Sequence, residues 1–251
     1  MELHAAIRAS QIPEWADCQA RADYHVKRNG PEIARPHVGA VLGTIVHTML
    51  LERHEDAFDN LPEFVEWDQW TRNERDLRRQ AGALYDLARH EMARREYGIL
   101  FSEVTLRREI VLPPVRLLVT GHMDAVIEHD ATRGLASFEL KTGAHQPKAA
   151  WLQTGVYAWL WEGKVRAQLA GLAEENNIHT SVVMWLNRRN ERILWHERET
   201  EPLRFAATRQ ILAIARSMSQ GVTYNPSSLA CSSCLVDDCP VRYEGGLTSV
   251  I

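Results

Sequence analysis

The chain has 251 residues, of which 45% are hydrophobic and 25% are charged, and its formal net charge is -4. This composition is that of an ordinary globular protein, and it excludes disordered, collagen-like and coiled-coil chains. The small negative charge gives no sign of a nucleic-acid partner, so any basic surface must be local.

The first third of the chain is predicted to be mainly helical. A first helix is expected over Ser10–Lys27, where Asn29-Gly30-Pro31 ends it. Apolar residues with helical spacing predict a second, largely buried helix over Val38–His54. After a polar connection over 56–66, the pattern predicts one long amphipathic helix, or two shorter ones, over Asp68–Glu96.

Strands are predicted in the middle of the chain, and helices and a hairpin follow. The predicted strands are Leu100–Leu112, Val115–Glu128 and Leu135–Lys141, separated by Pro113-Pro114 and by a polar loop. The later elements are helices over Pro147–Gly163 and Val165–Asn176, a hairpin of Thr180–Leu186 with Ile193–His196, and a helix over Pro202–Gln220. The fold class is therefore α/β, with a central mixed sheet flanked by helices in a single domain, 1–251.

No membrane-spanning helix is expected. The longest apolar run, Val41–Leu51, is interrupted by polar residues and is shorter than the ~20 residues that cross a bilayer. The N-terminal residues show no basic region leading into an apolar stretch, so no secretory signal is expected. These patterns predict a cytoplasmic protein without a membrane partner, in the host-cell cytoplasm if the protein is viral.

Two carboxylates are predicted to face each other across a hairpin. If the loop 129–134 closes a symmetrical antiparallel hairpin, Asp124 lies opposite Glu139 and His122 lies opposite Lys141, with His122 and Asp124 on one face. Opposed side chains have Cβ atoms about 4.5–5.5 Å apart, where like charges destabilise the pair. A bound Mg²⁺ or Mn²⁺ would compensate. The alternative is an exposed hairpin with scattered charges.

Two other pairs of residues lie one helical turn apart. In the first pair, Gly43 would allow a close approach to a neighbouring backbone, and His47 could offer a nitrogen to a metal. Gln153 and Tyr157 form the second pair, beside a buried run. Taken alone, a histidine such as His47 is more often a hydrogen-bonded core residue, and the second pair carries little information.

The four segments together resemble a known family. GTIVH, GHMD, ELK and QTGVY, in this order from Gly43 to Tyr157, resemble the PD-(D/E)XK nuclease superfamily, in particular its RecB-like branch with the CRISPR-associated exonucleases and viral relatives. The resemblance implies a restriction-endonuclease-like core with its catalytic motifs in 38–163 and a helical insertion over 55–97.

The resemblance also implies the roles of the site residues. His47, Asp124, Glu139 and the backbone carbonyl of Leu140 would bind Mg²⁺ or Mn²⁺. Lys141, one of only four lysines, would orient the attacking water or stabilise charge on the phosphate. Gln153 and Tyr157 would position Lys141 and the nucleotide. The chemistry implied is metal-assisted phosphodiester hydrolysis, with one or two metal ions.

Four cysteines form a second candidate metal site. Cys231, Cys234 and Cys239 lie within nine residues, whereas Cys18 lies near the other end of the chain. Disulfides are not expected inside a cell, and the spacing suits zinc, an iron–sulfur cluster or unligated thiols. With Pro240 after the last cysteine, the set resembles the iron–sulfur nucleases of the RecB-like branch, although the gap between Cys234 and Cys239 is shorter than usual. This implies a [4Fe-4S] cluster that joins the ends 1–30 and 221–251.

These features predict a Mg²⁺- or Mn²⁺-dependent DNA exonuclease that acts on single strands or ends. No phosphate-binding loop of an ATP motor is present, so unwinding would need a separate helicase, recombination or CRISPR partner. The alternatives are a non-catalytic iron–sulfur or zinc DNA-binding subunit and end processing in CRISPR spacer acquisition.

The arginines of 72–95, with Trp67 and Trp70, could line a DNA groove, although a solvated helix face is the more common explanation. Trp151, Trp159 and Trp161 have helical spacing and are predicted to be core residues.

Overall fold

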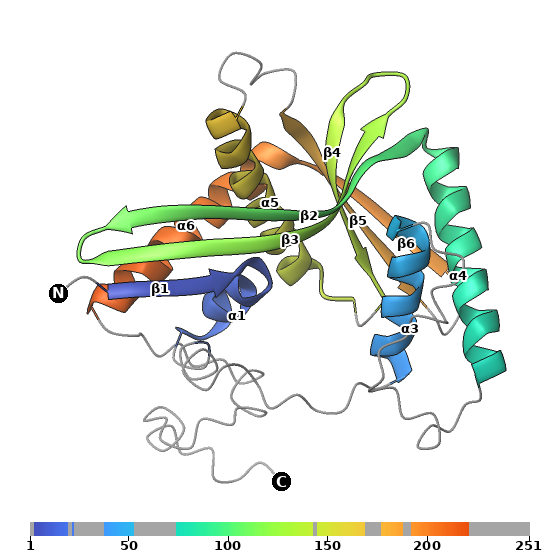
Figure 1. The fold of residues 1–251 in the computed structure, drawn as a ribbon, viewed down its shortest axis with the longest axis horizontal. Coiled ribbons are helices and arrows are strands. Elements are labelled where there is room, and N and C mark those ends of the chain that lie inside the picture. Colours follow the sequence, from blue (N-terminus) through green and yellow to red (C-terminus); the bar gives the residue numbers. More distant parts are fainter. Residues whose placement is uncertain are drawn as a thin grey trace, which may run out of the picture.

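The computed structural model describes residues 3–19, 22, 38–52, 74–142, 145–168, 177–187 and 192–220. Its centre is a mixed six-stranded sheet in the order β1-β3-β4-β5-β6, with β2 paired to β3 outside this path (Figure 1). The β1–β3 and β4–β5 pairs are parallel and the other pairs are antiparallel. The strands are β1 (Leu3–Arg8), β2 (Tyr97–Leu112), β3 (Val115–His129), β4 (Leu135–Lys141), β5 (Ile178–Asn187) and β6 (Arg192–Glu199).

Helices cover both faces of the sheet (Figure 1). One core lies between the sheet and α1, α5 and α6, and a second core lies between the sheet and α3 and α4. Trp159 and Trp161 belong to the first core, and Trp151 is also buried, which confirms the prediction for the three tryptophans. The helices are α1 (Ile12–Asp17), α3 (Val38–His47), α4 (Glu74–Arg94), α5 (Pro147–Gln168) and α6 (Thr200–Gln220), with a 3-10 turn η1 (Ala9–Gln11) and a π-helical segment η2 (Thr48–Glu52).

The N-terminal segment differs from the prediction of one helix over Ser10–Lys27. The chain begins with β1, a strand missing from the prediction, and α1 ends at Asp17 because Cys18 has an extended backbone. β1 forms through its parallel pairing with β3 and buries Ile7, so tertiary contacts override the weak strand propensity of its alanines. The prediction of one uninterrupted helix there was wrong.

The predicted boundary between two helices at Lys164 was also wrong. α5 continues through Gly163 to Gln168. Gly163 is retained within the helix because Arg108 packs against it, and a Cβ at this position would lie 2.7 Å from Arg108 Cδ. β4 has the predicted bounds, and β2, β3, β5, β6 and α6 differ from the prediction by a few residues at their ends. Of the predicted insertion over 55–97, the structure describes α4 and the start of β2, and residues 53–73 lie outside the described ranges.

None of the helices in the described ranges is long and apolar enough to cross a membrane.

The second predicted helix is α-helical to His47 and then widens into the π-helical segment Thr48–Glu52. Such segments often accompany functional sites in other proteins.

Gly155 is expected to be essential for the packing of α5 on α6. A Cβ at Gly155 would lie 2.7 Å from the carbonyl carbon of Leu203, and backbone cannot move aside as a flexible side chain can. Overpacking of this kind costs about 1–3 kcal/mol or more, which exceeds the gain in helix propensity. We expect Gly155→Ala to lower the melting temperature by about 4–8 °C in calorimetry.

The matched control is Gly82→Ala in α4. No heavy atom of the described residues lies within 4 Å of a Cβ at Gly82, so the same change there is expected to raise stability by about 0.5–1 kcal/mol. Equal effects of the two substitutions would contradict the packing argument.

Candidate active site

The β3–β4 register places Asp124 and Glu139 side by side. Ala125 pairs with Phe138 and Glu128 with Leu135, so Asp124 and Glu139 occupy the next opposed positions, as the hairpin prediction required. Both carboxylates are buried, with 9% and 3% of their surfaces exposed. The structure therefore confirms the predicted juxtaposition of two acidic side chains and places it inside the protein.

The sheet opens at this point. β2 follows one edge of β3, so β1 and β4 must share the other edge, where β1 pairs with residues 115–120 and β4 with residues 125–128. The motif Gly121–Asp124 lies in the interval between these two partners. Gly121 packs against α5, since a Cβ there would lie 2.8 Å from Leu160 and 3.1 Å from Tyr157. The interval brings Asp124 and Glu139 close to the side chains of α5.

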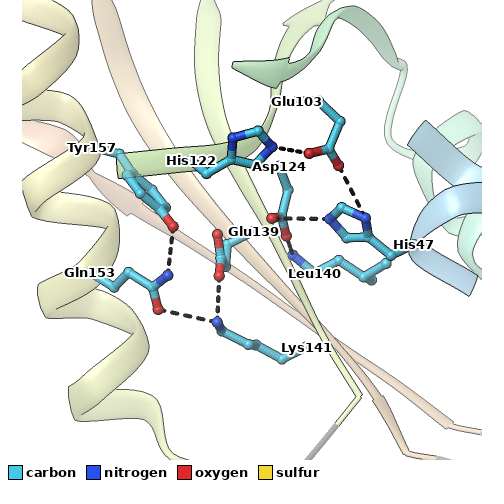
Figure 2. A network of polar contacts seen from close by, with 9 residues as sticks. All are labelled: His47, Glu103, His122, Asp124, Glu139, Leu140, Lys141, Gln153 and Tyr157. Carbon is cyan, nitrogen blue, oxygen red and sulfur yellow. Dashed lines mark hydrogen bonds and ion pairs between the residues drawn. The ribbon is translucent and has the colours of Figure 1, made fainter. Parts of the chain in front are cut away.

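Asp124 contacts both a neighbouring strand and a helix. Its Oδ2 accepts a hydrogen bond of 2.7 Å from the backbone N–H of Leu140, and its Oδ1 lies 3.1 Å from Nε2 of His47, the last residue of α3 (Figure 2). The approach of α3 is close because Gly43 lies against Thr142, the residue after β4. The close approach predicted from Gly43 is therefore observed, with a side chain instead of backbone as the neighbour.

A chain of polar contacts links Glu139 to α5 (Figure 2). Lys141 Nζ donates to Glu139 Oε1 and to Gln153 Oε1, the latter at 3.1 Å, and Gln153 Nε2 donates to the Tyr157 hydroxyl at 2.6 Å. The two bonds of Gln153 define the orientation of its amide. The structure thus brings together His47, Asp124, Glu139, Leu140, Lys141, Gln153 and Tyr157, the residues singled out from the sequence.

Burial and like charge perturb the titration of the site. Burial raises the pKa of Glu139 to about 8, with a further contribution from the charge of Asp124 and opposition from Lys141. Burial lowers the pKa of His47, but its bond to Asp124 and the charges of Asp124, Glu103 and Glu139 outweigh burial, so the net shift is upward. Burial and the two carboxylates also raise the pKa of Tyr157, which keeps its hydroxyl neutral.

His122 does not lie where the hairpin model placed it. The β3–β4 pairing ends at Ala125, and His122 contacts Glu103 and Thr105 of β2. Met123 and Val126 both belong to the core beneath α5 and α6, whereas Ala125 belongs to the other core, so the alternation of β3 shifts by one residue here. The expected pairing of His122 with Lys141 was wrong, although His122 and Asp124 still line one cleft together.

Glu103 is a site residue that the sequence analysis missed. Its carboxylate lies between His47 and His122 at the end of the polar network (Figure 2). A sequence signal was present. A symmetrical hairpin about Pro113-Pro114, like the one about the loop 129–134, places Glu103 opposite Asp124.

His47, Asp124 and Glu139 are the side chains of the site that could hold a divalent cation. In the described ranges no three His, Cys, Asp or Glu side chains are arranged to hold a metal ion, and the donor atoms of His47, Asp124 and Glu139 are turned toward partners within the site. However, Glu139 Oε2 is buried and has no hydrogen-bond partner among the described residues. Such an oxygen is costly to bury unless it meets a donor or a cation. The chemistry of the set therefore fits a hard cation.

The second predicted metal site is described only in part. Cys18 lies at the C-terminal end of α1, partly exposed, and Cys231, Cys234 and Cys239 lie outside the described residues. Of the predicted DNA groove, Trp67, Trp70 and Arg72 are likewise outside. Arg94 and Arg95 of the same region form ion pairs with Glu91.

Comparison with known proteins identifies the family. The profile described as "PD-(D/E)XK nuclease superfamily" matches residues 7–240. The chain belongs to this superfamily. Nucleases of the PD-(D/E)XK superfamily generally use Mg²⁺ or Mn²⁺, in agreement with the buried carboxylate pair. No curated protein matches the chain.

Solved structures with the same fold include a protein of Eubacterium rectale described as "Putative exonuclease". It is 11% identical, with a TM-score of 0.56, over 98% of this chain and 89% of that chain. A crystal structure of SSO0001 matches with 12% identity and a TM-score of 0.46, over 94% of this chain and 87% of that chain. The similarity to the Eubacterium rectale protein shows a shared fold.

Proposed function

We propose that the protein is a Mg²⁺- or Mn²⁺-dependent DNA exonuclease of the RecB-like branch that hydrolyses single strands or DNA ends. The observation that carries the proposal is the buried pair Asp124 and Glu139 with Lys141 bonded to Glu139. A scaffold protein gains nothing from two carboxylates buried side by side, because their repulsion destabilises the fold. A nuclease needs such a pair.

The side chains of the site have distinct roles in this proposal. Asp124, Glu139 and the Leu140 carbonyl would supply the oxygen ligands of the metal, and His47 would supply a nitrogen ligand. When bound, a divalent metal lowers the pKa of water and neutralises charge on the phosphoryl oxygens. Lys141 would hold the attacking water or the phosphate with its ammonium group, and Gln153 and Tyr157 would hold Lys141 in place.

Two clefts adjoin the site, and a nucleic-acid strand would enter through them. One cleft is lined by Arg8, Thr105, Asp124 and Glu139, and the lining of the second includes Lys141 and Trp185 together with the acidic Glu14 and Asp17. Both include Ser10 and Gln153, so the two clefts adjoin, with the carboxylates in the first and Lys141 in the second. Arg8 would provide a positive charge for a phosphate in the first cleft. The preference for ends follows the resemblance to RecB-like exonucleases and agrees with the description of the Eubacterium rectale structure.

The proposal is tested with purified protein and end-labelled linear DNA, single- and double-stranded. We expect cleavage with Mg²⁺ or Mn²⁺ and none with EDTA or with Ca²⁺, because Ca²⁺ accepts loose, high-coordination geometry and activates water poorly. A covalently closed single-stranded circle should survive much longer than its linear form. Full activity in EDTA would refute the metal mechanism. Equal rates of cleavage of the circular and the linear DNA would identify the protein as an endonuclease.

We also propose that Cys18, Cys231, Cys234 and Cys239 hold a [4Fe-4S] cluster, with zinc as the alternative metal. The support is the cysteine spacing and the resemblance to iron–sulfur nucleases. Cys18 directly follows α1, and both α1 and the turn Ala9–Gln11 contact α5, which carries Gln153 and Tyr157. A cluster at Cys18 would therefore tether the segment that lines the clefts.

Cys18→Ala is expected to remove the cluster. Closing a loop over nearly the whole chain restrains the unfolded state, and metal binding at a folded site adds free energy to folding, so the variant should lose iron and visible absorbance and should melt at a lower temperature. Activity should fall only as far as structure is lost. Iron content, absorbance and melting temperature are measured together. Unchanged iron content in Cys18→Ala would contradict the proposed tether, and stoichiometric zinc without iron would identify a zinc site.

A further inference from the structure

Glu103 lies directly opposite Asp124 on the neighbouring strand. Ser102 pairs with Ala125 and Val104 pairs with Met123, so Glu103 occupies the position across from Asp124, yet it is not itself paired in the ladder. Three acidic residues on three adjacent strands, Glu103, Asp124 and Glu139, are therefore at one level of the sheet. The proposed metal ligands account for two of them.

The backbone at Glu103 has an unusual conformation. Its φ is 52°, in the left-handed region, and β3 shifts its alternation at the same level of the sheet. A side chain with a Cβ is disfavoured in this region, and such residues persist where surrounding contacts hold them, often at functional sites. The contacts of the Glu103 carboxylate are therefore informative.

The two carboxylate oxygens of Glu103 meet two different histidines (Figure 2). Oε1 lies 3.1 Å from Nδ1 of His47, and Oε2 contacts Nε2 of His122. Oε1 is buried, and although it is within ion-pair distance of His47 it has no aligned hydrogen bond in the described residues. His122 is more than half exposed, whereas the side chains of Glu103 and His47 are 28% and 26% exposed. The inner contact of Glu103 is thus the one with His47.

His47 lies between two carboxylates and presents a different nitrogen to each. Nδ1 faces Glu103, and Nε2 lies 3.1 Å from Asp124 Oδ1. A histidine that binds a metal through one nitrogen commonly directs the other N–H to a carboxylate, which selects the tautomer and orients the ring. His47 shows both features, since Nδ1 faces the carboxylate of Glu103 and Nε2 faces the buried acidic pair, where the metal would bind.

We propose that Glu103 is a positioning residue that holds His47 with Nδ1 protonated and Nε2 directed to the metal bound at Asp124 and Glu139. This inference rests on the proposed function. Glu103 acts through His47 and does not bind the metal itself. Loss of such an outer carboxylate commonly costs about 10- to 100-fold in metal affinity.

The test measures Mn²⁺ binding to the metal-free protein by calorimetry, without DNA. We expect Glu103→Ala to weaken Mn²⁺ binding by about 10- to 100-fold. Glu103→Gln should recover part of the affinity, because its amide oxygen can face Nδ1 as the carboxylate oxygen does. In a His47→Gln background, Glu103→Ala should cause no further loss, since coupled residues are not additive. Glu109→Ala is the matched control, an exposed glutamate on the same strand that pairs with Arg116 and should leave binding unchanged.

Each outcome decides the inference. Parent-like Mn²⁺ affinity in Glu103→Ala overturns it, and so does a loss that adds fully to that of His47→Gln, because Glu103 would then act independently of His47. An equal loss in His122→Ala would also overturn it, since the carboxylate would act through its other partner. If Glu103→Ala does not fold, as judged by circular dichroism, the same comparison is made with Glu103→Gln. Failure of the parent protein to bind Mn²⁺ would remove the proposed function and the inference with it, whereas an unaffected variant of a Mn²⁺-binding parent overturns the inference alone.

Discussion

Replacing Lys141 by alanine is expected to reduce DNA cleavage by at least about 100- to 1,000-fold, the range seen when one group that stabilises transition-state charge is removed. Lys141 Nζ lies between Glu139 and Gln153, and Gln153 is in turn bonded to Tyr157. Alanine leaves the carboxylates in place and removes the only ammonium group in this network (Figure 2). The measurement is the initial rate on linear single-stranded DNA at saturating Mn²⁺.

Mn²⁺ binding should not be lost together with cleavage in Lys141→Ala. In the metal-free protein Lys141 occupies Glu139 Oε1, so its removal frees this oxygen and should leave Mn²⁺ affinity unchanged or increased. If Lys141→Ala loses cleavage but retains Mn²⁺ affinity, Lys141 acts in catalysis and does not merely support the fold. Gln153→Ala should show a smaller loss of rate, because Lys141 remains but loses one of its two contacts.

Lys164→Ala is the control for the lysine substitution. Lys164 lies on α5, the helix that carries Gln153, and its ammonium group lies over the ring of Trp161. This variant should cleave DNA at the parent rate. The assignment of Lys141 would be wrong if Lys141→Ala cut DNA as fast as Lys164→Ala.

The register of the acidic hairpin was predictable from the sequence because the turn and the strands agree. A short polar loop between two apolar strands leaves one symmetrical pairing, and a one-residue slip would place Phe138 and Ile127 on the wrong face. The same reasoning applied to Pro113-Pro114 would have revealed Glu103. Local turn geometry therefore contains much of the information about which polar residues meet on adjacent strands.

β1 was not predictable in this way. Its sequence, LHAAIR, is short and rich in alanine, and its partner residues 115–120 lie more than one hundred positions away. Strand formation there depends on the free edge that β2 and β4 leave on β3, a property of the assembled sheet. The interval between β1 and β4 that brings Asp124 close to α5 was unpredictable for the same reason.

The shift in alternation at Asp124 has a similar origin. Period-two alternation along one strand assumes a regular ladder, and the left-handed backbone of Glu103 interrupts the ladder from the adjacent strand. A pattern in the sequence of β3 alone contains no signal of an irregularity in β2. This is why the hairpin register predicted the position of Asp124 correctly, next to the last paired residues of β3 and β4, and the position of His122, beyond that pairing, incorrectly.

Glu139→Gln is expected to abolish cleavage and at the same time to stabilise the metal-free protein at alkaline pH. In the folded protein, burial and the charge of Asp124 raise the pKa of Glu139 to about 8, above its ordinary value of 4.5. Between these two values the folded state holds a proton that the unfolded state has released. The free energy of unfolding of the metal-free protein therefore falls as pH rises through this interval.

The expected size of this effect follows from linkage. From pH 6 to pH 8 one proton at Glu139 accounts for a loss of about 2 kcal/mol, or about 4–8 °C in melting temperature. His47, whose pKa is raised, contributes a loss in the same direction as pH rises through its folded value. In Glu139→Gln the first contribution disappears and the second remains, so the pH profile should become flatter and the variant should be the more stable protein at pH 8.

Metal binding should offset the loss of stability that the parent protein shows as pH rises. A divalent cation binds the ionised form of Glu139, so Mn²⁺ should raise the melting temperature more at pH 8 than at pH 6, with release of protons on binding. Glu139→Gln should show neither the stabilisation by Mn²⁺ nor cleavage. Glu109→Gln, the exposed control, should behave as the parent does. This account would be contradicted if the metal-free parent protein became more stable between pH 6 and pH 8, and more steeply so than Glu139→Gln. Glu139 would then be ionised over the whole interval, and its burial beside Asp124 would need another explanation.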